Sequence, residues 1–350
     1  MCILGDYGKV VTGNTPPTKD IENYENGTYL WASPADLSTI KLISETKTKL
    51  SSKGFSKTRA LPKGSVLVTC IGSTIGKTGM ATKEMSTNQQ INSIVVNDNN
   101  DNEFVYYAIQ SAFPRYLSSI AVQAVPIISK SAFEMLPNKR PCLQEQKKIG
   151  KFLSLLDERI ATQCKIIDKL QSLIKGIAQK IVRSNKPNVR LYECVECSSS
   201  TQQESEVCEQ GAYPVYGANG IVGYLDDYNT EGEAVYIIKD GSGVGTVSYV
   251  TGKCSATGTL NTLQAKDGYS LQYLYYLLKV FNFEPYKTGM AIPHIYFKDY
   301  GKAKVFCPSY TEQLQYARLL SAIDSKLSVE KNTLRNLSLQ KQYLLRQMFI

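Results

Sequence analysis

Apolar residues recur along the segment 143–184 in alternating steps of four and three. The positions of this seam are Ile149, Leu153, Leu156, Ile160, Gln163, Ile167, Leu170, Ile174, Ile177 and Ile181. All of them are Ile or Leu except Gln163. Such a heptad stripe is typical of a helix that must cover its apolar face with another helix. The pattern therefore predicts a helix of roughly 35 to 40 residues, on the order of 50 to 60 Å long.

The same pattern returns in the segment 308–350. Adding 167 to each number of the first seam gives Tyr316, Leu320, Ile323, Leu327, Glu330, Leu334, Leu337, Lys341, Leu344 and Met348. The residues at the helix starts also correspond: Pro141 with Pro308, Glu145 with Glu312, and Gln146 with Gln313. Ser309 and Glu312 have the spacing of a capping box, in which each side chain bonds to the backbone of the other residue. Because length, phase and start all match, we expect an antiparallel helix pair rather than two unrelated core helices.

The segments 1–142 and 191–307 have the shorter apolar runs and turn signals of mixed α and β structure. Their features repeat at an offset of 169, which becomes 167 after a two-residue deletion. The matched residues are Gly72 with Gly241, Gly76 with Gly245, Tyr106 with Tyr275, Tyr107 with Tyr276, Ala124 with Ala291, Pro126 with Pro293, and Ile128 with Ile295. The chain is therefore predicted to be a tandem duplication of mixed α/β class.

The expected parts follow from this repeat. They are a globular domain at 1–142, a helix at 143–184, a breaker linker at 185–190, a second globular domain at 191–307 and a second helix at 308–350. An antiparallel helix pair would hold the two domains at opposite ends of a spacer on the order of 50 Å.

Composition adds a possible partner and a compartment. The 350 residues carry a formal charge of +9 and are 43% hydrophobic, which allows two ordinary domains and favours a polyanionic partner. The nine cysteines are odd in number and scattered, for example Cys2, Cys70, Cys142, Cys164 and Cys307, which indicates reduced thiols and a cytoplasmic protein. No signal-peptide pattern and no long apolar stretch are present, so we expect a protein that is neither exported nor membrane-spanning.

Nucleotide binding is not supported by the glycine-rich turn. Residues 72–78 read Gly-Ser-Thr-Ile-Gly-Lys-Thr, whereas a phosphate-binding P-loop needs one more residue between its first glycine and the Gly-Lys pair. The matching turn at Gly241 has no lysine at all. We expect a tight turn whose polar side chains could meet phosphates or base edges.

Other catalytic or metal-binding patterns are equally weak. Asp36 with Glu45 and Lys47 has a loose nuclease-like outline but no counterpart in the second half, so a solvated loop is favoured. Cys194 and Cys197 lack the second close pair of a zinc site, which favours buried thiols even with Cys208 and Cys254 further on. The single histidine, His294, matches Ile127, so the two halves share no general-base chemistry. No catalytic residue, cofactor or metal is expected.

The candidate residues that remain are polar and suited to nucleic acid. Asn and Gln can bond bidentately to adenine, lysines can meet phosphates or guanine, and hydroxyls can meet either. The candidates are Asn14, Thr15, Ser73, Thr74, Lys77, Asn88, Gln89, Gln90, Tyr216, Asn219, Lys239, Ser242 and Thr257. For each tyrosine a core role is at least as good an interpretation. Two diverged domains on a fixed spacer would read two different short sequences at a set distance.

At this point the residues resemble a known family. The pattern Pro-x-Leu-x-Glu-Gln-x-x-Ile at 141–149, followed by Phe-Leu-Ser-Leu-Leu-Asp-Glu-Arg-Ile at 152–160, resembles the first conserved region of specificity (S, HsdS) subunits of type I restriction-modification systems. The segment 308–349 resembles the second. The segments 13–16, 31–37, 64–76 and 88–89 look like landmarks of their target recognition domains. Such chains usually have several more residues before Leu4, so the first strand is expected to be incomplete or supplied differently.

The resemblance implies a noncatalytic subunit that binds an asymmetric bipartite DNA target, with one target recognition domain for each half-site. It would recruit methyltransferase (M) subunits, which carry S-adenosylmethionine and methylate adenine, and through them ATP-dependent restriction (R) subunits. The polar seam residues Gln163, Glu330 and Lys341 would fix the helix register. The alternatives are a coiled-coil scaffold without DNA affinity and, less favoured, a self-contained nuclease or NTPase.

Overall fold

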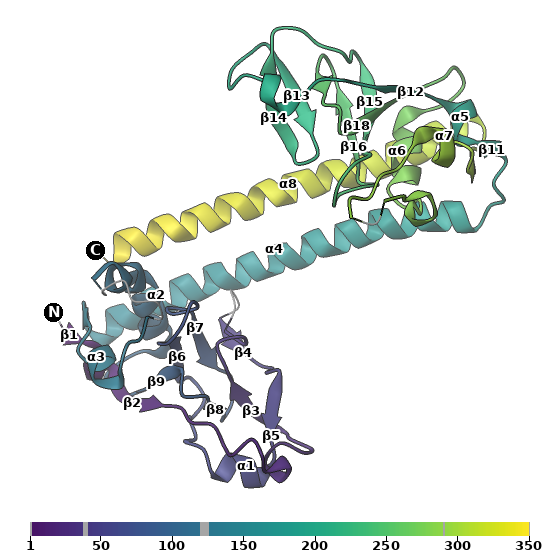
Figure 1. Ribbon diagram of the computed structural model, residues 1–350. Coiled ribbons are helices and arrows are strands. Elements are labelled where there is room, and N and C mark those ends of the chain that lie inside the picture. The colour runs from purple at the N-terminus through teal and green to yellow at the C-terminus, as the bar shows by residue number, and fades with distance from the viewer. Residues whose placement is uncertain (1, 38–40, 120–125, 290, 350) are drawn as a thin grey trace. The chain divides into compact units, whose positions relative to one another are not determined.

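The chain forms two compact units in a computed structural model that describes residues 2–37, 41–119, 126–289 and 291–349 (Figure 1). One unit consists of Met1–Thr162 with Leu334–Ile350, and the other of Gln163–Thr333. Each unit joins a mixed α/β domain to part of two long helices, α4 (Leu143–Arg183) and α8 (Tyr310–Met348). The predicted fold class is confirmed. Ala124 of the repeat lies outside the described residues.

The first unit is built on a five-stranded sheet. The strand order is β2 (Gly8–Thr12), β9 (Ile91–Val96), β6 (Val66–Thr69), β7 (Thr78–Ala81) and β4 (Leu42–Ile43). Every pairing is antiparallel except β4 with β7, which is parallel. A smaller sheet has the order β5 (Thr48–Leu50), β3 (Tyr29–Ala32) and β8 (Ser86–Thr87), and β1 (Cys2–Ile3) pairs with β10 (Pro137–Asn138).

Short helices and one longer helix complete this unit. They are η1 (Leu4–Tyr7), η2 (Ile21–Asn23), α1 (Ser52–Ser56), α2 (Asn102–Ser119) and α3 (Lys130–Glu134). One apolar core joins α2 and the sheet to both long helices. It includes Leu153 of α4 and Phe349, which directly follows α8, and Leu344 of α8 packs against it. Gln146 at the start of α4 accepts a hydrogen bond of 3.0 Å from the Asp101 backbone N–H, just before α2.

The second unit repeats this plan with one strand fewer. Its main sheet has the order β12 (Val195–Ser199), β18 (Leu260–Ala265), β15 (Glu233–Ile238) and β16 (Val247–Thr251). Its smaller sheet has the order β14 (Gly220–Leu225), β13 (Tyr213–Gly217) and β17 (Ser255–Ala256). The other elements are β11 (Val189–Arg190), α5 (Leu191–Cys194), η3 (Glu204–Glu206), α6 (Leu271–Leu278), η4 (Glu284–Tyr286), α7 (Phe297–Tyr300) and β19 (Lys304–Val305).

Equivalent strands and contacts confirm the duplication. The strand β11 pairs with β19 as β1 pairs with β10. The last two residues of the expected linker thus belong to β11. The strands β1 and β11 each have two residues, and β2 and β12 each contribute five residues to their ladders. Within the described residues, the first strand is therefore as long as its counterpart. Gln313 accepts a bond of 2.9 Å from the Ser270 N–H, as Gln146 does from Asp101.

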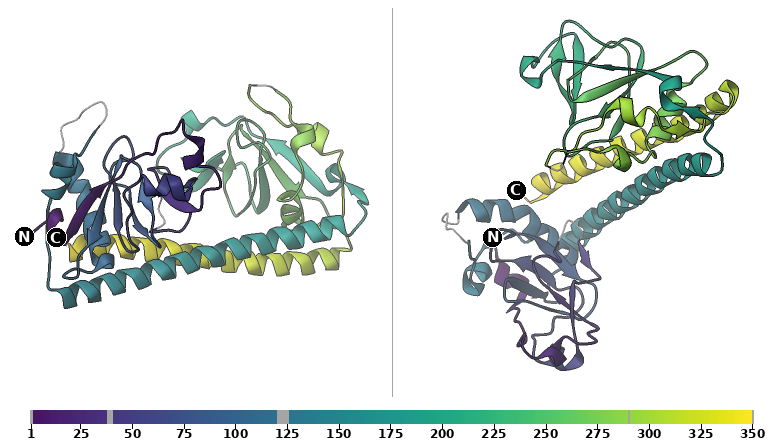
Figure 2. Two further views of the ribbon diagram at one scale, coloured as in Figure 1. Left: turned by 90° about the horizontal axis from the view of Figure 1, so that it is seen from below. Right: turned by 45° about the vertical axis from the view of Figure 1, so that its right-hand side comes forward.

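The long helices pair antiparallel within each unit, and Figure 2 shows them side by side. In the first unit, Lys341 Nζ lies 2.6 Å from Asp157 Oδ1. In the second, the Gln163 amide donates to the Glu330 carbonyl at 3.1 Å. The α8 start differs from the expected capping box, because the Glu312 carboxylate accepts both the N–H and the hydroxyl of Ser309. In the part of the chain that the structure describes, no helix is both long enough and apolar enough to cross a membrane.

Candidate nucleic-acid interface

Three loops of the first unit leave the same end of its main sheet. Thr12, the last residue of β2, is paired with Asn92, and Thr69, the last residue of β6, is paired with Ile91. The loops 13–15, 70–77 and 88–90 therefore begin or end at one edge of the sheet. All eight first-domain candidates lie in these loops, so the fold brings them together.

Gly13 makes the closest approach between two of the loops. A Cβ at this position would lie 2.2 Å from the Asn88 carbonyl oxygen, so any side chain would collide with the backbone. The next residues bond across the same gap: the Asn14 N–H donates to Thr87 O at 2.9 Å, and the Thr15 hydroxyl donates to Gln89 Oε1 at 2.5 Å. The Gln89 side chain is exposed, and Thr15 orients it.

Two predicted asparagines are used inside the loop framework. Asn14 donates its amide to Lys57 O at 2.9 Å and accepts from the Arg59 N–H at 3.1 Å. Asn88 is buried and bonds to Gln90 through both its amide nitrogen and its amide oxygen. These contacts hold the loops in shape and leave Gln89 as the amide directed to solvent.

The glycine-rich turn contributes a further exposed group. Gly72 and Gly76 have φ of 93° and 90°, a region that favours glycine. The N–H groups of Gly72, Ile75, Gly76 and Lys77 donate to carbonyls of the protein, and so they do not point at a phosphate as in a P-loop. Ser73 and Lys77 are exposed, while Thr74 is partly exposed.

The second unit has the same backbone turn. Gly241 and Gly245 have φ of 92° and 88°. The Gly241 N–H donates to Pro293 O at 3.0 Å, as the Gly72 N–H does to Pro126 O at 3.1 Å. Ser242 is exposed at its tip. Lys239 is partly exposed, and its backbone bonds to neighbouring chain on both sides.

The side chains at this end of the two domains differ although the backbone does not. The Thr257 N–H donates to Tyr216 O at 2.9 Å, as the Asn88 N–H does to Ala32 O at 2.9 Å. The positions of Gln89, Gln90 and Lys77 are then held by Gly258, Thr259 and Thr246. One framework thus presents two different sets of hydrogen-bonding groups.

The remaining second-domain candidates have mixed environments. Tyr216 packs on Tyr236 with ring centroids 5.6 Å apart, and burial raises the pKa of its hydroxyl. Thr257 is 1% exposed, and its hydroxyl bonds to that of Thr259 at 2.8 Å. Asn219 is exposed in the turn between β13 and β14. Thr257 therefore supports the fold of its loop from inside the domain, whereas Asn219 faces solvent.

Sequence reasoning missed Arg59. This exposed residue donates from Nη1 to Thr12 O at 2.6 Å, which places its guanidinium at the end of β2. The signal was the run of basic residues between 53 and 63.

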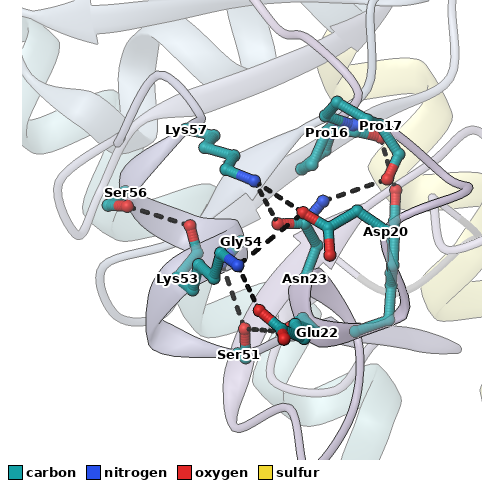
Figure 3. A network of polar contacts seen from close by, with 11 residues as sticks. Pro16, Pro17, Asp20, Glu22, Asn23, Ser51, Lys53, Gly54, Ser56 and Lys57 are labelled. Atoms are coloured by element: carbon teal, nitrogen blue, oxygen red, sulfur yellow. Dashed lines mark hydrogen bonds and ion pairs between the residues drawn. The ribbon is translucent and has the colours of Figure 1, made fainter.

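The neighbouring lysines of that run are held by acidic partners (Figure 3). Lys57 Nζ lies 2.9 Å from Asp20 Oδ2 and 2.8 Å from Asn23 Oδ1, and Lys53 forms an ion pair with Glu22. The hydrogen bond from Lys57 holds the pKa of Asp20 below its usual value. This network ties η2 to α1. It leaves Arg59 as the better candidate for a phosphate contact.

The patterns set aside as catalytic are explained by local structure. Asp36 accepts from the N–H and hydroxyl of Ser33 and from the Lys47 N–H, so it shapes a loop. Glu45 forms an ion pair with Lys49 at 2.8 Å. Among the described residues, no group of three or more Asp, Glu, His or Cys side chains is placed to hold a metal.

The cysteines and the histidine have partners of other kinds. Cys194 Sγ lies 3.8 Å from Cys307 Sγ rather than beside Cys197, and both of these thiols are buried. Cys254 is also buried, whereas Cys197 is partly buried and Cys208 is exposed. The expectation of buried thiols therefore holds only in part for Cys197 and is wrong for Cys208. His294 Nδ1 lies 2.6 Å from Asp240 Oδ1.

These features define a class of two-domain recognition protein. Its two α/β domains share one backbone framework, are joined to one pair of long helices, and carry different side chains at equivalent loops. A family profile described as the type I restriction modification DNA specificity domain matches residues 2–172 and again 188–338. The two matches cover most of the 350 residues. The chain belongs to this family.

Individual relatives agree with this assignment. The chain is 20% identical over 346 residues to the type I restriction enzyme EcoprrI specificity subunit of Escherichia coli, covering 89% of this chain and 84% of that protein. It is 29% identical over 176 residues to the MjaIX specificity subunit of Methanocaldococcus jannaschii, covering 49% of this chain and 40% of the relative. A crystal structure of a type I S subunit from M. genitalium superposes with a TM-score of 0.70 at 20% identity, over 99% of this chain and 95% of that one.

Proposed function

We propose that this chain is the noncatalytic DNA-specificity subunit of a type I restriction-modification enzyme and binds an asymmetric bipartite duplex target. The observation that carries the proposal is the pair of family domains with equivalent frameworks and different side chains at equivalent loops. Gln89 in one domain is replaced by Gly258 in the other, and Lys77 by Thr246. Two such surfaces would read two different half-sites.

The loop end of each sheet is the base-reading surface. In the first domain, 1–142, the exposed Gln89 amide can bond to an adenine edge, and its orientation is set by Thr15. Lys77 and Arg59 flank it and would contact phosphates. In the second domain, 191–307, Ser242 and Lys239 have the corresponding roles. The formal charge of +9 favours association with the polyanion.

The long helices, over 143–184 and 308–350, would dock M subunits. Phe152 on α4 is 48% exposed, and Leu319 on α8 is 51% exposed. The two residues are equivalent under the offset of 167. Exposed apolar residues at matching places favour equivalent partners on the two helices. The M subunits would supply S-adenosylmethionine and adenine methylation, and R subunits would join through them.

The cytoplasmic location of the protein follows from its proposed DNA partner. A subunit that acts on cellular or incoming DNA works in the cytoplasm, in agreement with cysteines that are all free.

Fluorescence anisotropy with a labelled duplex tests the proposal. The chain with its M subunit should bind its target duplex far more tightly than a scrambled duplex, with an affinity that falls steeply with salt. Lys77→Ala should lower the salt slope by about 1 because one phosphate contact is lost. The control Lys180→Ala, exposed on α4, should leave the slope unchanged. Absence of DNA affinity with and without M would favour the scaffold alternative and contradict the proposal.

A further inference from the structure

The first unit contains a lysine held inside a polar cluster. Lys41 Nζ donates to Glu103 Oε2 at 2.7 Å, to Ser154 Oγ at 2.9 Å and to the Tyr107 hydroxyl oxygen at 3.2 Å. The Lys41 side chain is only 10% exposed. Tyr107 in turn donates to Asp157 Oδ2 at 2.6 Å. The cluster therefore joins α2 to α4 through one ammonium group.

An edge strand delivers this lysine. Lys41 directly precedes β4, which pairs in parallel with the outer edge of β7 (Figure 1). The Met80 N–H on β7 donates to Lys41 O at 2.8 Å. The backbone of residues 41–43 thus completes the sheet, while the Lys41 side chain completes the cluster.

The second unit keeps the frame of this cluster. Gln272, Tyr276, Ser321 and Asp324 stand at the positions of Glu103, Tyr107, Ser154 and Asp157. The strand β16 takes the place of β7, with Tyr249 at the position of Met80. The Tyr276 hydroxyl donates to Asp324 Oδ2, as Tyr107 does to Asp157, but at the longer distance of 3.4 Å.

The groups that fill the cluster are missing from the second unit. Within the described ranges, no strand pairs with the outer edge of β16, and no cation lies within ion-pair distance of Asp324. In their place is a hollow of about 280 Å³. Its lining includes Tyr249, Gln272, Tyr276, Ser321 and Asp324, the equivalents of the groups around Lys41 and β4.

A second hollow lies where Lys341 stands in the first unit. Ile174 holds the equivalent position, and a volume of about 460 Å³ is lined by Lys175, Lys279 and Lys331 among others. These lysines supply positive charge on that side. Lys279 is already bonded to the Tyr275 hydroxyl at 3.0 Å. The hollow at the Lys41 position has no lysine in its lining.

The outer edge of β16 has backbone groups that could pair with a further strand. The Gly252 N–H donates to Gly232 O at 2.9 Å, on the β15 side. Because N–H groups alternate along a strand, those of Tyr249 and Thr251 point to the opposite, outer side. An open edge of this kind binds an extended peptide by adding it as a strand.

We propose that an extended segment of the M subunit adds to the outer edge of β16, in parallel as β4 adds to β7, and inserts a lysine side chain into the hollow beside Asp324. The ammonium group would bond to the Asp324 carboxylate, the Ser321 hydroxyl and the Tyr276 hydroxyl. The inference rests on the proposed function, since it assigns a contact to the M partner. A peptide fits better than a small amine because the Tyr249 N–H needs a backbone carbonyl.

The asymmetry between the halves follows directly. In the first unit the chain fills the equivalent site with its own β4 and Lys41, so that site is closed to a partner. An M subunit bound to the first domain would lack this contact. The second domain would then hold M through a specific ion pair that the first cannot make.

The test measures binding of purified M to the full-length chain by biolayer interferometry. Asp324→Asn should weaken the binding by about tenfold or more, because the variant loses a charge-assisted hydrogen bond. Asp267→Asn, an equal charge change at an exposed loop residue, should stay within about twofold. Acetylating the lysines of M beforehand should remove the difference between wild type and Asp324→Asn.

A second measurement needs no variant. Hydrogen-deuterium exchange of the wild-type chain should show the amides of Tyr249 and Thr251 becoming protected when M is added. Equal M binding by wild type and Asp324→Asn, with unchanged exchange at β16, would overturn the inference and leave the proposed function standing. Failure of the wild-type chain to bind M at all would overturn both.

Discussion

Gln163 and Glu330 are equivalent residues of the two halves, and they bond to each other. The Gln163 amide donates to the Glu330 carbonyl at 3.1 Å and also to its carboxylate. In an antiparallel pair of equivalent helices, equivalent positions meet only at the centre of the pairing. The polar breaks at Gln163 and Glu330 are therefore one contact, while the third, Lys341, pairs with Asp157. The shared contact supports the hypothesis that these residues set the register.

Replacing both residues tests that hypothesis. Gln163→Leu with Glu330→Leu should raise the thermal midpoint, because the centre of the seam becomes apolar, but it should permit shifted pairing and higher oligomers. Light scattering after gel filtration, with thermal unfolding, measures both effects. The control Glu158→Leu, at an exposed position of α4, should change neither. A double variant that stays in the wild-type oligomeric state and pairing would argue against a role in register.

The same contact predicts an acid dependence of stability. The hydrogen bond from Lys326, followed by that from Gln163, lowers the pKa of Glu330 from its ordinary value of 4.5. A lowered folded-state pKa gives stability that is fully present above the ordinary value and is lost as pH falls through the lowered one. Urea unfolding of wild type and Glu330→Gln should show a constant difference near neutral pH, shrinking below about pH 4.5. If the stability difference between the two proteins grew on acidification, the pKa of Glu330 would be raised rather than lowered in the folded state, contrary to the prediction.

The buried lysine of the first unit should matter for folding. Lys41→Met should lower the free energy of unfolding by about 2 to 4 kcal/mol, since Glu103 and the Tyr107 hydroxyl lose their shared partner. Lys47→Met, at an exposed position nearby, should cost at most about 0.5 kcal/mol. Hydrogen exchange should place the loss of protection in the first unit alone. Equal effects of the two variants would mean that the cluster contributes no more than a surface charge.

Two glycines of the duplicated turns, which are not equivalent positions but have nearly the same φ, separate backbone strain from steric collision. Gly76 and Gly241 have φ of 90° and 92°, but a Cβ on Gly76 would lie 2.5 Å from Phe113 Cδ1, whereas one on Gly241 would meet nothing within 4 Å. Gly241→Ala should therefore cost about 1 to 2 kcal/mol of backbone strain. Gly76→Ala should cost roughly 1 to 3 kcal/mol more through overpacking. Denaturant unfolding measures both, and equal costs would contradict the predicted collision.

Periodic features of the chain could be predicted from the sequence. The apolar seams define α4 and α8 because a heptad stripe is a local pattern of one helix. The turns at Gly72 and Gly241 were recognisable because left-handed backbone favours glycine and the spacing repeats. Duplication helped further, since each half is a check on the other.

Long-range polar contacts could not be predicted in the same way. Asn14 and Thr257 have side chains that could bond to bases, but the structure uses both inside their domains. Asn14 bonds to residues more than 40 positions along the chain, and Thr257 is buried and bonds to Thr259. Arg59 belongs at the loop end only because its guanidinium reaches the end of β2. The cluster around Lys41 depends on the pairing of β4 with β7. A strand of only two apolar residues gives no periodic pattern from which this pairing could be predicted.

Methylome sequencing of a host that expresses this chain with its M subunit tests the central claim most directly. Wild type should yield one asymmetric, bipartite motif methylated at adenine. Gln89→Ala with Gln90→Ala should relax or change one half of the motif and preserve the other half and the spacer. A motif whose two halves both change, or a single continuous motif, would contradict the account of two separate readers.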